Sequence, residues 1–187
     1  MQVSNRNKDH RSILVLAVVC GTLQLALVPN IGLGNGRANL ALVFSACIAL
    51  TVGGRKSVLA GFFAGLFFDL STTGPIGLMS LLLSVSAYLL GLQGRNRITG
   101  DLGLTMGTFT VHALAVSLAY HVTMLLVGEA GGFLDVVVLR TLPTALLTVI
   151  AFIPFAIWLT RVQPSGPNLG GGRRRSSRGS HFNMRGL

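Results

Sequence analysis

The 187 residues are 51% hydrophobic and only 11% charged, with a mean hydropathy of +0.68, and this composition argues against a water-soluble globule. The formal net charge is +10 and the sequence pI is about 11.5. Because aromatic residues are sparse and the basic residues flank apolar runs, this charge indicates membrane topology and argues against nucleic acid as a partner.

Apolar runs separated by turn residues divide the chain into three parts. We expect a cytoplasmic N-terminal head at residues 1–11, an all-α bundle of about six transmembrane helices at residues 12–161, and a basic, disordered cytoplasmic tail at residues 162–187. Pro143 and Pro154 predict that the last helix is kinked or preceded by an interfacial segment. In chain order, the predicted helices are Ser12–Val28, Asn39–Val52, Ser57–Leu70, Gly77–Leu92, Leu102–Val127 and Phe133–Thr160.

The distribution of Lys and Arg over the loops predicts the orientation in the membrane. Three basic residues lie in the head, two at Arg55 and Lys56, two between the fourth and fifth predicted helices, and six from Arg161 onward. The loops of the opposite side contain only Arg37. Cytoplasmic loops carry the excess of basic residues. The pattern therefore predicts that both termini are cytoplasmic and that the number of spans is even.

Two charged residues fall inside or at the end of predicted spans and require an explanation. Asp69 lies late in the third helix, where the helix dipole disfavours a negative charge, so a partner or a polar cavity is expected. Arg140 is a candidate partner, because both residues map toward the outer leaflet and an intramembrane ion pair would leave neither charge alone. The alternative is that each side chain reaches the outer headgroups separately.

The sequence offers no credible active site, metal site or cofactor site. His112 and His121 are nine residues apart and lie on nearly opposite faces of one helix, so they cannot readily share an ion. No cluster of Cys, His or carboxylates has metal-ligand spacing. Serines and threonines in the spans lack a neighbouring His and carboxylate. We therefore expect neither an enzyme nor a bound cofactor.

Small residues four apart mark helix faces that permit close approach of another helix. Packing within the chain and contact with a partner helix both explain such faces. The pairs are Ala17 and Gly21, Ala60 and Ala64, Gly61 and Gly65, and Gly103 and Gly107.

One segment resembles a known family. Residues 60–78 read AGFFAGLFFDLSTTGPIGL and are continued by AYLLG at residues 87–91. This text resembles the signature of the rod shape-determining protein MreD family, which reads approximately G-x-x-x-G-L-x-x-D, a short loop, then P-x-G. We define the candidate motif as Gly61, Gly65, Asp69, Pro75 and Gly77, and Leu66 also matches the pattern. The role of this motif is either partner binding or structural.

The resemblance implies a non-catalytic membrane scaffold of the bacterial cell-elongation machinery, located in the inner membrane. It implies binding to the bitopic protein MreC, and cooperation with the cytoskeletal protein MreB, with RodA and with a penicillin-binding protein in lateral peptidoglycan synthesis. It also implies a fold similar to the substrate-binding subunits of energy-coupling-factor transporters. The corner from Asp69 to Gly77 is then expected to shape a docking surface near the periplasmic side.

Two other functional classes compete with this one. A substrate-binding subunit of an energy-coupling-factor vitamin transporter is the alternative, but it needs aromatic and polar groups that converge at one face, and the outer loops hold few beyond Arg37, Asp69, His121 and Glu129. A transferase for lipid-linked precursors lacks the clustered carboxylates that would bind a divalent ion.

The basic tail has two interpretations. Each Arg near an anionic leaflet contributes about 1 kcal/mol of attraction, which favours binding of anionic lipids. Contact with an acidic cytoplasmic partner is the alternative.

Overall fold

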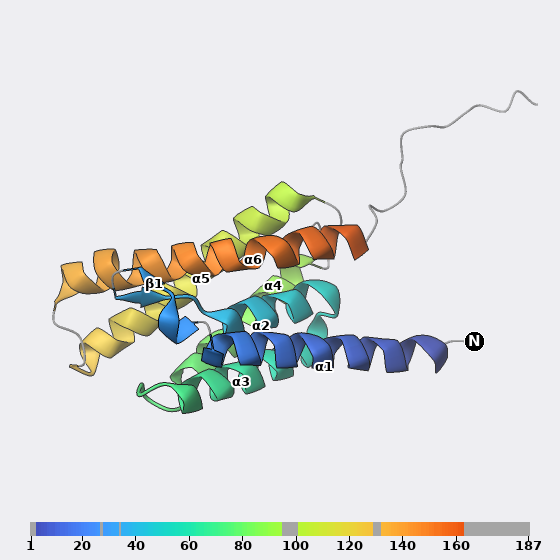
Figure 1. Ribbon diagram of the computed structural model, residues 1–187, viewed down its shortest axis with the longest axis horizontal. Coiled ribbons are helices and arrows are strands. Elements are labelled where there is room, and N and C mark those ends of the chain that lie inside the picture. The colour runs from blue at the N-terminus through green and yellow to red at the C-terminus, as the bar shows by residue number, and fades with distance from the viewer. Residues whose placement is uncertain (1–2, 27, 34, 95–100, 129–131, 163–187) are drawn as a thin grey trace, which may run out of the picture.

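The computed structural model describes residues 3–26, 28–33, 35–94, 101–128 and 132–162. These residues fold almost entirely as helices, which confirms the expected all-α class (Figure 1). The predicted tail lies outside the described residues, except for its first residue, which ends the last helix. The α-helices are α1 (Val3–Ala26), α2 (Leu40–Thr51), α3 (Gly54–Ser71), α4 (Leu78–Gly94), α5 (Leu102–Leu126) and α6 (Leu142–Val162).

Short irregular elements connect the helices at one end of the bundle. After α1 come a 3-10 turn, η1 (Val28–Asn30), and two antiparallel two-residue strands, β1 (Gly32–Leu33) and β2 (Gly36–Arg37). A π-helix, η2 (Asp135–Thr141), leads directly into α6. That this segment is interfacial stays a prediction, and Pro154 lies inside α6 without ending it.

At the starts of α2 and α5, the side chain of the preceding residue accepts hydrogen bonds from backbone N–H groups of the first turn. At α5, the Asp101 carboxylate accepts from Gly103 N–H at 2.8 Å and from Leu104 N–H at 3.3 Å. Helix α1 begins at Val3, within the predicted polar head. It therefore starts earlier than the predicted helix, which began with the apolar run at Ser12.

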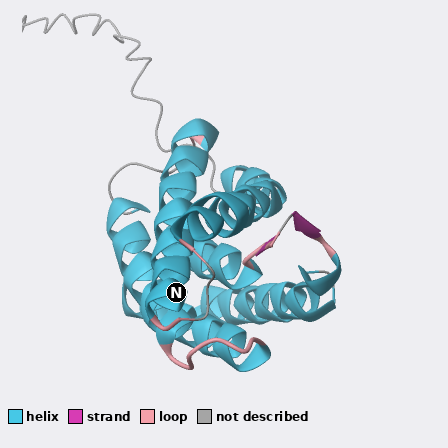
Figure 2. Cartoon of the chain, turned by 90° about the vertical axis from the view of Figure 1, so that its left-hand side faces the viewer, coloured by secondary structure: helices cyan, strands magenta, loops and turns pink. Residues whose placement is uncertain are grey.

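The helices run back and forth between two ends of the bundle. The first turn of α1 and the last turn of α6 lie at the same end, which we call the N-terminal end (Figure 1). The strands and the corner between α3 and α4 lie at the other, which we call the strand end; Figure 2 shows it face on. Contacts agree with this arrangement, because Gly91 packs beside Gly53 at one end and Gly36 packs against Pro143 at the other.

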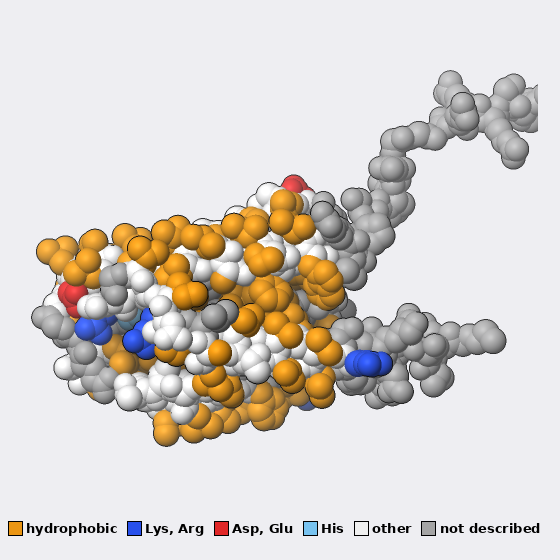
Figure 3. Space-filling model, viewed as in Figure 1, with side chains coloured by type: hydrophobic (Ala, Val, Ile, Leu, Met, Phe, Trp, Pro, Cys, Tyr) orange, Lys and Arg blue, Asp and Glu red, His pale blue; other side chains and the backbone are white. Residues whose placement is uncertain are grey.

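The outside of the bundle is apolar, as a lipid-facing surface must be (Figure 3). Within the described residues, three segments are long and apolar enough to cross a membrane: Ile13–Asn30, Leu102–Leu126 and Asp135–Leu159. α2 and most of α4 are shorter apolar helices. These segments are those of a multi-pass membrane protein.

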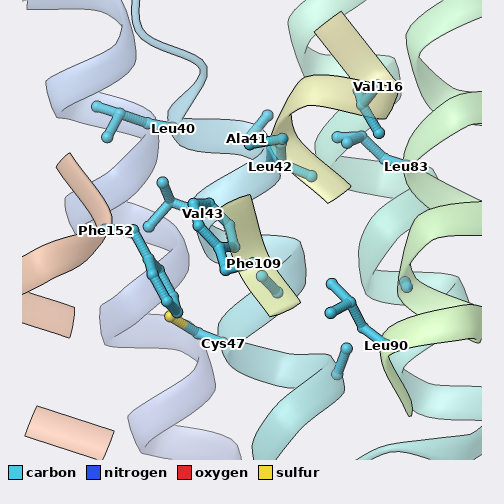
Figure 4. Close-up of a cluster of buried hydrophobic side chains, with 14 of the residues drawn as sticks. Leu40, Ala41, Leu42, Val43, Cys47, Leu83, Leu90, Phe109, Val116 and Phe152 are labelled. Atoms are coloured by element: carbon cyan, nitrogen blue, oxygen red, sulfur yellow. The ribbon is translucent and has the colours of Figure 1, made fainter. Parts of the chain in front are cut away.

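The short helix α2 forms the centre of the bundle. Its twelve residues rise about 18 Å, well under the thickness of a hydrocarbon core of about 30 Å. Nearly every side chain of α2 is buried, because α1, α3, α4 and α6 surround it. Beside it, the rings of Phe109 and Phe152 stack with centroids 3.8 Å apart (Figure 4). The apolar core thus joins segments far apart in sequence.

Candidate functional site

The candidate motif lies where α3 turns into α4. The buried residues of α3 recur every four positions, at Ser57, Gly61, Gly65 and Asp69, and so form one stripe along the helix. This stripe faces α4, since the nearest atoms to Gly61 and Gly65 outside α3 include backbone atoms of that helix. Packing within the chain therefore explains these small residues.

The two glycines allow the backbones of α3 and α4 to touch. A Cβ atom on Gly65 would lie 2.3 Å from the Cα atom of Ser80, and one on Gly61 would lie 2.7 Å from the carbonyl oxygen of Leu83. Real Cβ atoms essentially never come so close to other heavy atoms. Because backbone atoms cannot rotate away as a flexible side chain can, any side chain here would force the helices apart.

Asp69 caps a helix other than its own. Its side chain is 2% exposed, and its Oδ2 atom accepts from the N–H groups of Gly77 at 2.9 Å and Ser80 at 3.2 Å, while Oδ1 accepts from Met79 N–H at 3.1 Å. These groups are the unpaired donors at the start of α4. The positive end of the α4 dipole adds attraction for the carboxylate. The expected partner of the buried carboxylate is therefore a set of backbone N–H groups at the start of α4.

Pro75 and Gly77 complete the corner. The carbonyl oxygen of Pro75 accepts from Leu78 N–H at 3.3 Å, which closes the turn before α4. Gly77 has a φ of +101°, a conformation that residues with a Cβ atom rarely adopt. Its carbonyl oxygen also accepts from the hydroxyl group of Ser80 at 3.0 Å. The structure thus brings all five motif residues together in one helical hairpin.

The structure gives Arg140 a different partner from Asp69. Its Nε atom lies 3.2 Å from the Oδ2 atom of Asp135, five residues earlier in the π-helix η2. The two side chains are 28% and 30% exposed. Within the described residues, no salt bridge joins Arg140 to Asp69, whose carboxylate is occupied by the α4 amides. The ion pair expected from sequence is thus replaced by two separate sets of contacts.

A second polar cluster, which sequence reasoning missed, holds the buried start of α2. The side-chain oxygen of Gln24 accepts from Leu40 N–H at 2.8 Å, and that of Asn39 accepts from Leu42 N–H at 3.0 Å. The hydroxyl oxygen of Thr148 accepts from Asn39 N–H at 2.9 Å. Inside a membrane bundle these N–H groups need acceptors from the protein, because the lipid hydrocarbon offers none. The available signal was an Asn placed directly before an unusually short apolar run.

The two histidines of α5 bond to their own helix. The Nδ1 atom of His112 lies 2.9 Å from the carbonyl oxygen of Thr108, and that of His121 lies 2.8 Å from the carbonyl oxygen of Ser117. Across the described ranges, no group of three or more His, Cys, Asp or Glu side chains is placed to hold a metal ion. His121 instead borders a cavity of about 220 Å³ at the strand end of the bundle.

Comparison with known proteins identifies the family. The family model described as rod shape-determining protein MreD matches residues 7–162. No curated protein and no solved structure matches the chain significantly, so the expected likeness to energy-coupling-factor subunits stays a prediction. The match reaches all six α-helices, lacking only the first four residues of α1, and includes the whole of the hairpin described above. The chain therefore belongs to the rod shape-determining protein MreD family, whose members are non-catalytic membrane proteins of cell-shape determination.

Proposed function

We propose that this protein is a membrane scaffold of the cell-elongation machinery that binds MreC and helps to direct lateral peptidoglycan synthesis together with MreB, RodA and a penicillin-binding protein. The family match over residues 7–162 is the observation that carries this proposal. A scaffold needs a rigid bundle with a helix face left open for a partner. The α3–α4 hairpin supports both requirements.

The proposed orientation places the N-terminal end of the bundle in the cytoplasm of a bacterial cell. Exposed basic residues lie toward this end: Arg11 in the first half of α1, and Arg55 and Lys56 in the first turn of α3. Such residues are retained on the cytoplasmic side of bacterial membrane proteins. At the other end, one of the two described arginines, Arg140, is paired with an acid. The strand end is then periplasmic.

The outward face of α3 is the proposed docking surface for the transmembrane helix of MreC. Because the stripe with Gly61 and Gly65 is used against α4, the opposite side of α3 is exposed along its whole length. We define the α3 face by four exposed apolar residues, which are Leu59 (57%), Phe63 (64%), Phe67 (40%) and Leu70 (69%).

A groove beside the α3 face suits an apolar helix. A cavity of about 380 Å³ lies between α1 and α3, with small residues such as Ala17 and Gly21 on one wall and Ala60 and Ala64 on the other. The small residues let a partner helix approach both backbones, and the rings of Phe63 and Phe67, which also line the cavity, offer it apolar contact. Close packing of this kind drives association in a bilayer. MreC is bitopic and supplies one such helix.

Site-specific photo-crosslinking in cells tests the docking surface. A photoreactive residue at Phe63 should crosslink to MreC, and one at Val111 should not. Val111 is the matched control because it is also 64% exposed but lies on α5. Equal crosslinking at the two positions, or none at Phe63 with normal expression, would refute docking on the α3 face.

Asp69 is expected to act on this surface from inside the hairpin. Since its carboxylate holds the start of α4 and is buried, Asp69→Ala should weaken MreC co-purification by distorting the corner and not by removing a direct contact. Asp101→Ala, which removes an exposed cap at the N-terminal end, is the control. Full recovery of MreC with Asp69→Ala and intact folding would overturn this role.

A further inference from the structure

The strand end of the bundle contains a polar cavity that the scaffold function does not use. Its volume is about 220 Å³, below the roughly 300 to 1,000 Å³ of typical small-molecule pockets, so the cavity suits only a small chemical group. The walls come from the ends of α1, α3 and α5, the segment before α2 and the start of α6. Its polar lining includes Gln24, Arg37, Ser117, His121 and Thr144.

The charge of this cavity is positive. Among its described lining residues, Arg37 is a cation and none is Asp or Glu. The guanidinium group of Arg37 forms no salt bridge or hydrogen bond with any residue that the structure describes, while its backbone N–H donates to the Thr144 hydroxyl group at 3.3 Å. At this end of the bundle, Figure 3 shows basic side chains near an acidic one.

Neutral groups of the lining keep free hydrogen-bonding capacity. The oxygen of the Gln24 side chain is used by Leu40 N–H, which leaves its NH₂ group without an acceptor among the described residues. Because the Nδ1 atom of His121 donates to the Ser117 carbonyl group, the Nε2 atom of the neutral ring is an acceptor. The cavity therefore offers a cation, a neutral donor and one acceptor.

We infer that this cavity binds the phosphate group of a small ligand or of a lipid headgroup. A guanidinium group binds phosphate oxygens through two parallel hydrogen bonds, and the Gln24 NH₂ group adds a third donor. A singly protonated phosphate also has an O–H donor for the Nε2 atom of His121. An ionised carboxylate has no such donor and would leave that nitrogen unpaired. The inference goes beyond the scaffold proposal and does not depend on MreC.

Thermal unfolding of the full chain in a neutral detergent tests this site. Inorganic phosphate and a short-chain phosphatidylglycerol are the two probes, each compared with sodium chloride at equal ionic strength. We expect phosphate-dependent stabilisation of the unaltered chain and apparent binding at least about tenfold weaker in Arg37→Gln. Arg37→Lys keeps the charge but loses the paired hydrogen bonds, so its binding should be intermediate.

Arg55→Gln is the matched control, because Arg55 is an exposed arginine at the N-terminal end of the bundle. It should bind as the unaltered chain does. Stabilisation by inorganic phosphate identifies a soluble ligand, and stabilisation by the lipid alone identifies a headgroup; either supports the site if it depends on Arg37. Stabilisation by neither probe, or equal stabilisation of Arg37→Gln and the unaltered chain, would overturn it.

Discussion

Oδ2 of Asp69, near the end of one helix, accepts a hydrogen bond at 2.9 Å from the backbone N–H of Gly77, just before the next helix begins. This bond crosses the corner formed by the candidate motif. Burial of the Asp69 carboxylate alone would cost free energy, but its hydrogen bonds make it the cap of α4. The first role of the candidate motif is therefore structural, because it fixes the angle and register of α4 against α3.

Removal of this carboxylate should be the most destabilising single change at the corner. Asp69→Ala leaves three backbone N–H groups unpaired, and we expect a loss of about 3 kcal/mol or more. Asp69→Asn keeps one acceptor oxygen and should lose less. Thermal unfolding in detergent checks both variants against Asp101→Ala, which should lose only about 1 kcal/mol. Equal losses at Asp69 and Asp101 would contradict the helix-capping role.

Helix contact at Gly65 provides an independent prediction. Gly65→Ala places a methyl group against the backbone of Ser80, so α3 and α4 must separate and the apparent melting temperature should fall. Gly107→Ala is the matched control, since a Cβ atom there meets nothing within 4 Å and alanine favours a helix more than glycine. It should be neutral or stabilising. A similar fall of the melting temperature in both variants would contradict the role of Gly65 in the close contact between α3 and α4.

Helix positions were predictable because apolar runs in this chain end at glycines, charges or turn residues. The predicted boundaries of α2 to α5 agree with the structure within a few residues. Asp69 was also singled out, because a buried charge near a helix C-terminus needs compensation. Its true partners could not be predicted, since backbone amides come within reach only when the Gly61 and Gly65 stripe has brought α4 against α3.

Arg140 illustrates a second limit of sequence reasoning. Its partner Asp135 is five residues away, a spacing that does not place side chains together on an ordinary α-helix. In the π-helix η2, hydrogen bonds join residues five apart, and the same spacing appears where the Thr141 hydroxyl group donates to the Val136 carbonyl group. The change from α-helix to π-helix therefore brings Asp135 and Arg140 together, and no periodicity in the sequence predicts this change.

The buried start of α2 should depend on Gln24. Gln24→Leu keeps a side chain of similar size but leaves Leu40 N–H without its acceptor, at an expected cost of about 1 to 3 kcal/mol. Thr22→Val is the control, because that hydroxyl group is exposed and bonds only to carbonyl groups of its own helix. Unfolding midpoints of the two variants give the comparison. A Gln24→Leu chain as stable as the unaltered one would mean that α2 is held by apolar packing alone.

A double-mutant cycle distinguishes the two accounts of the charged residues. In the structure Asp69 and Arg140 have separate partners, so the stability losses of Asp69→Asn and Arg140→Gln should add within about 0.5 kcal/mol. The pair of Asp135→Asn and Arg140→Gln should instead show a coupling of about 0.2 to 1 kcal/mol, as is typical of partly exposed salt bridges. A coupling above about 1 kcal/mol between Asp69 and Arg140 would restore the direct intramembrane ion pair, and the carboxylate would then have to leave the α4 amides to reach it.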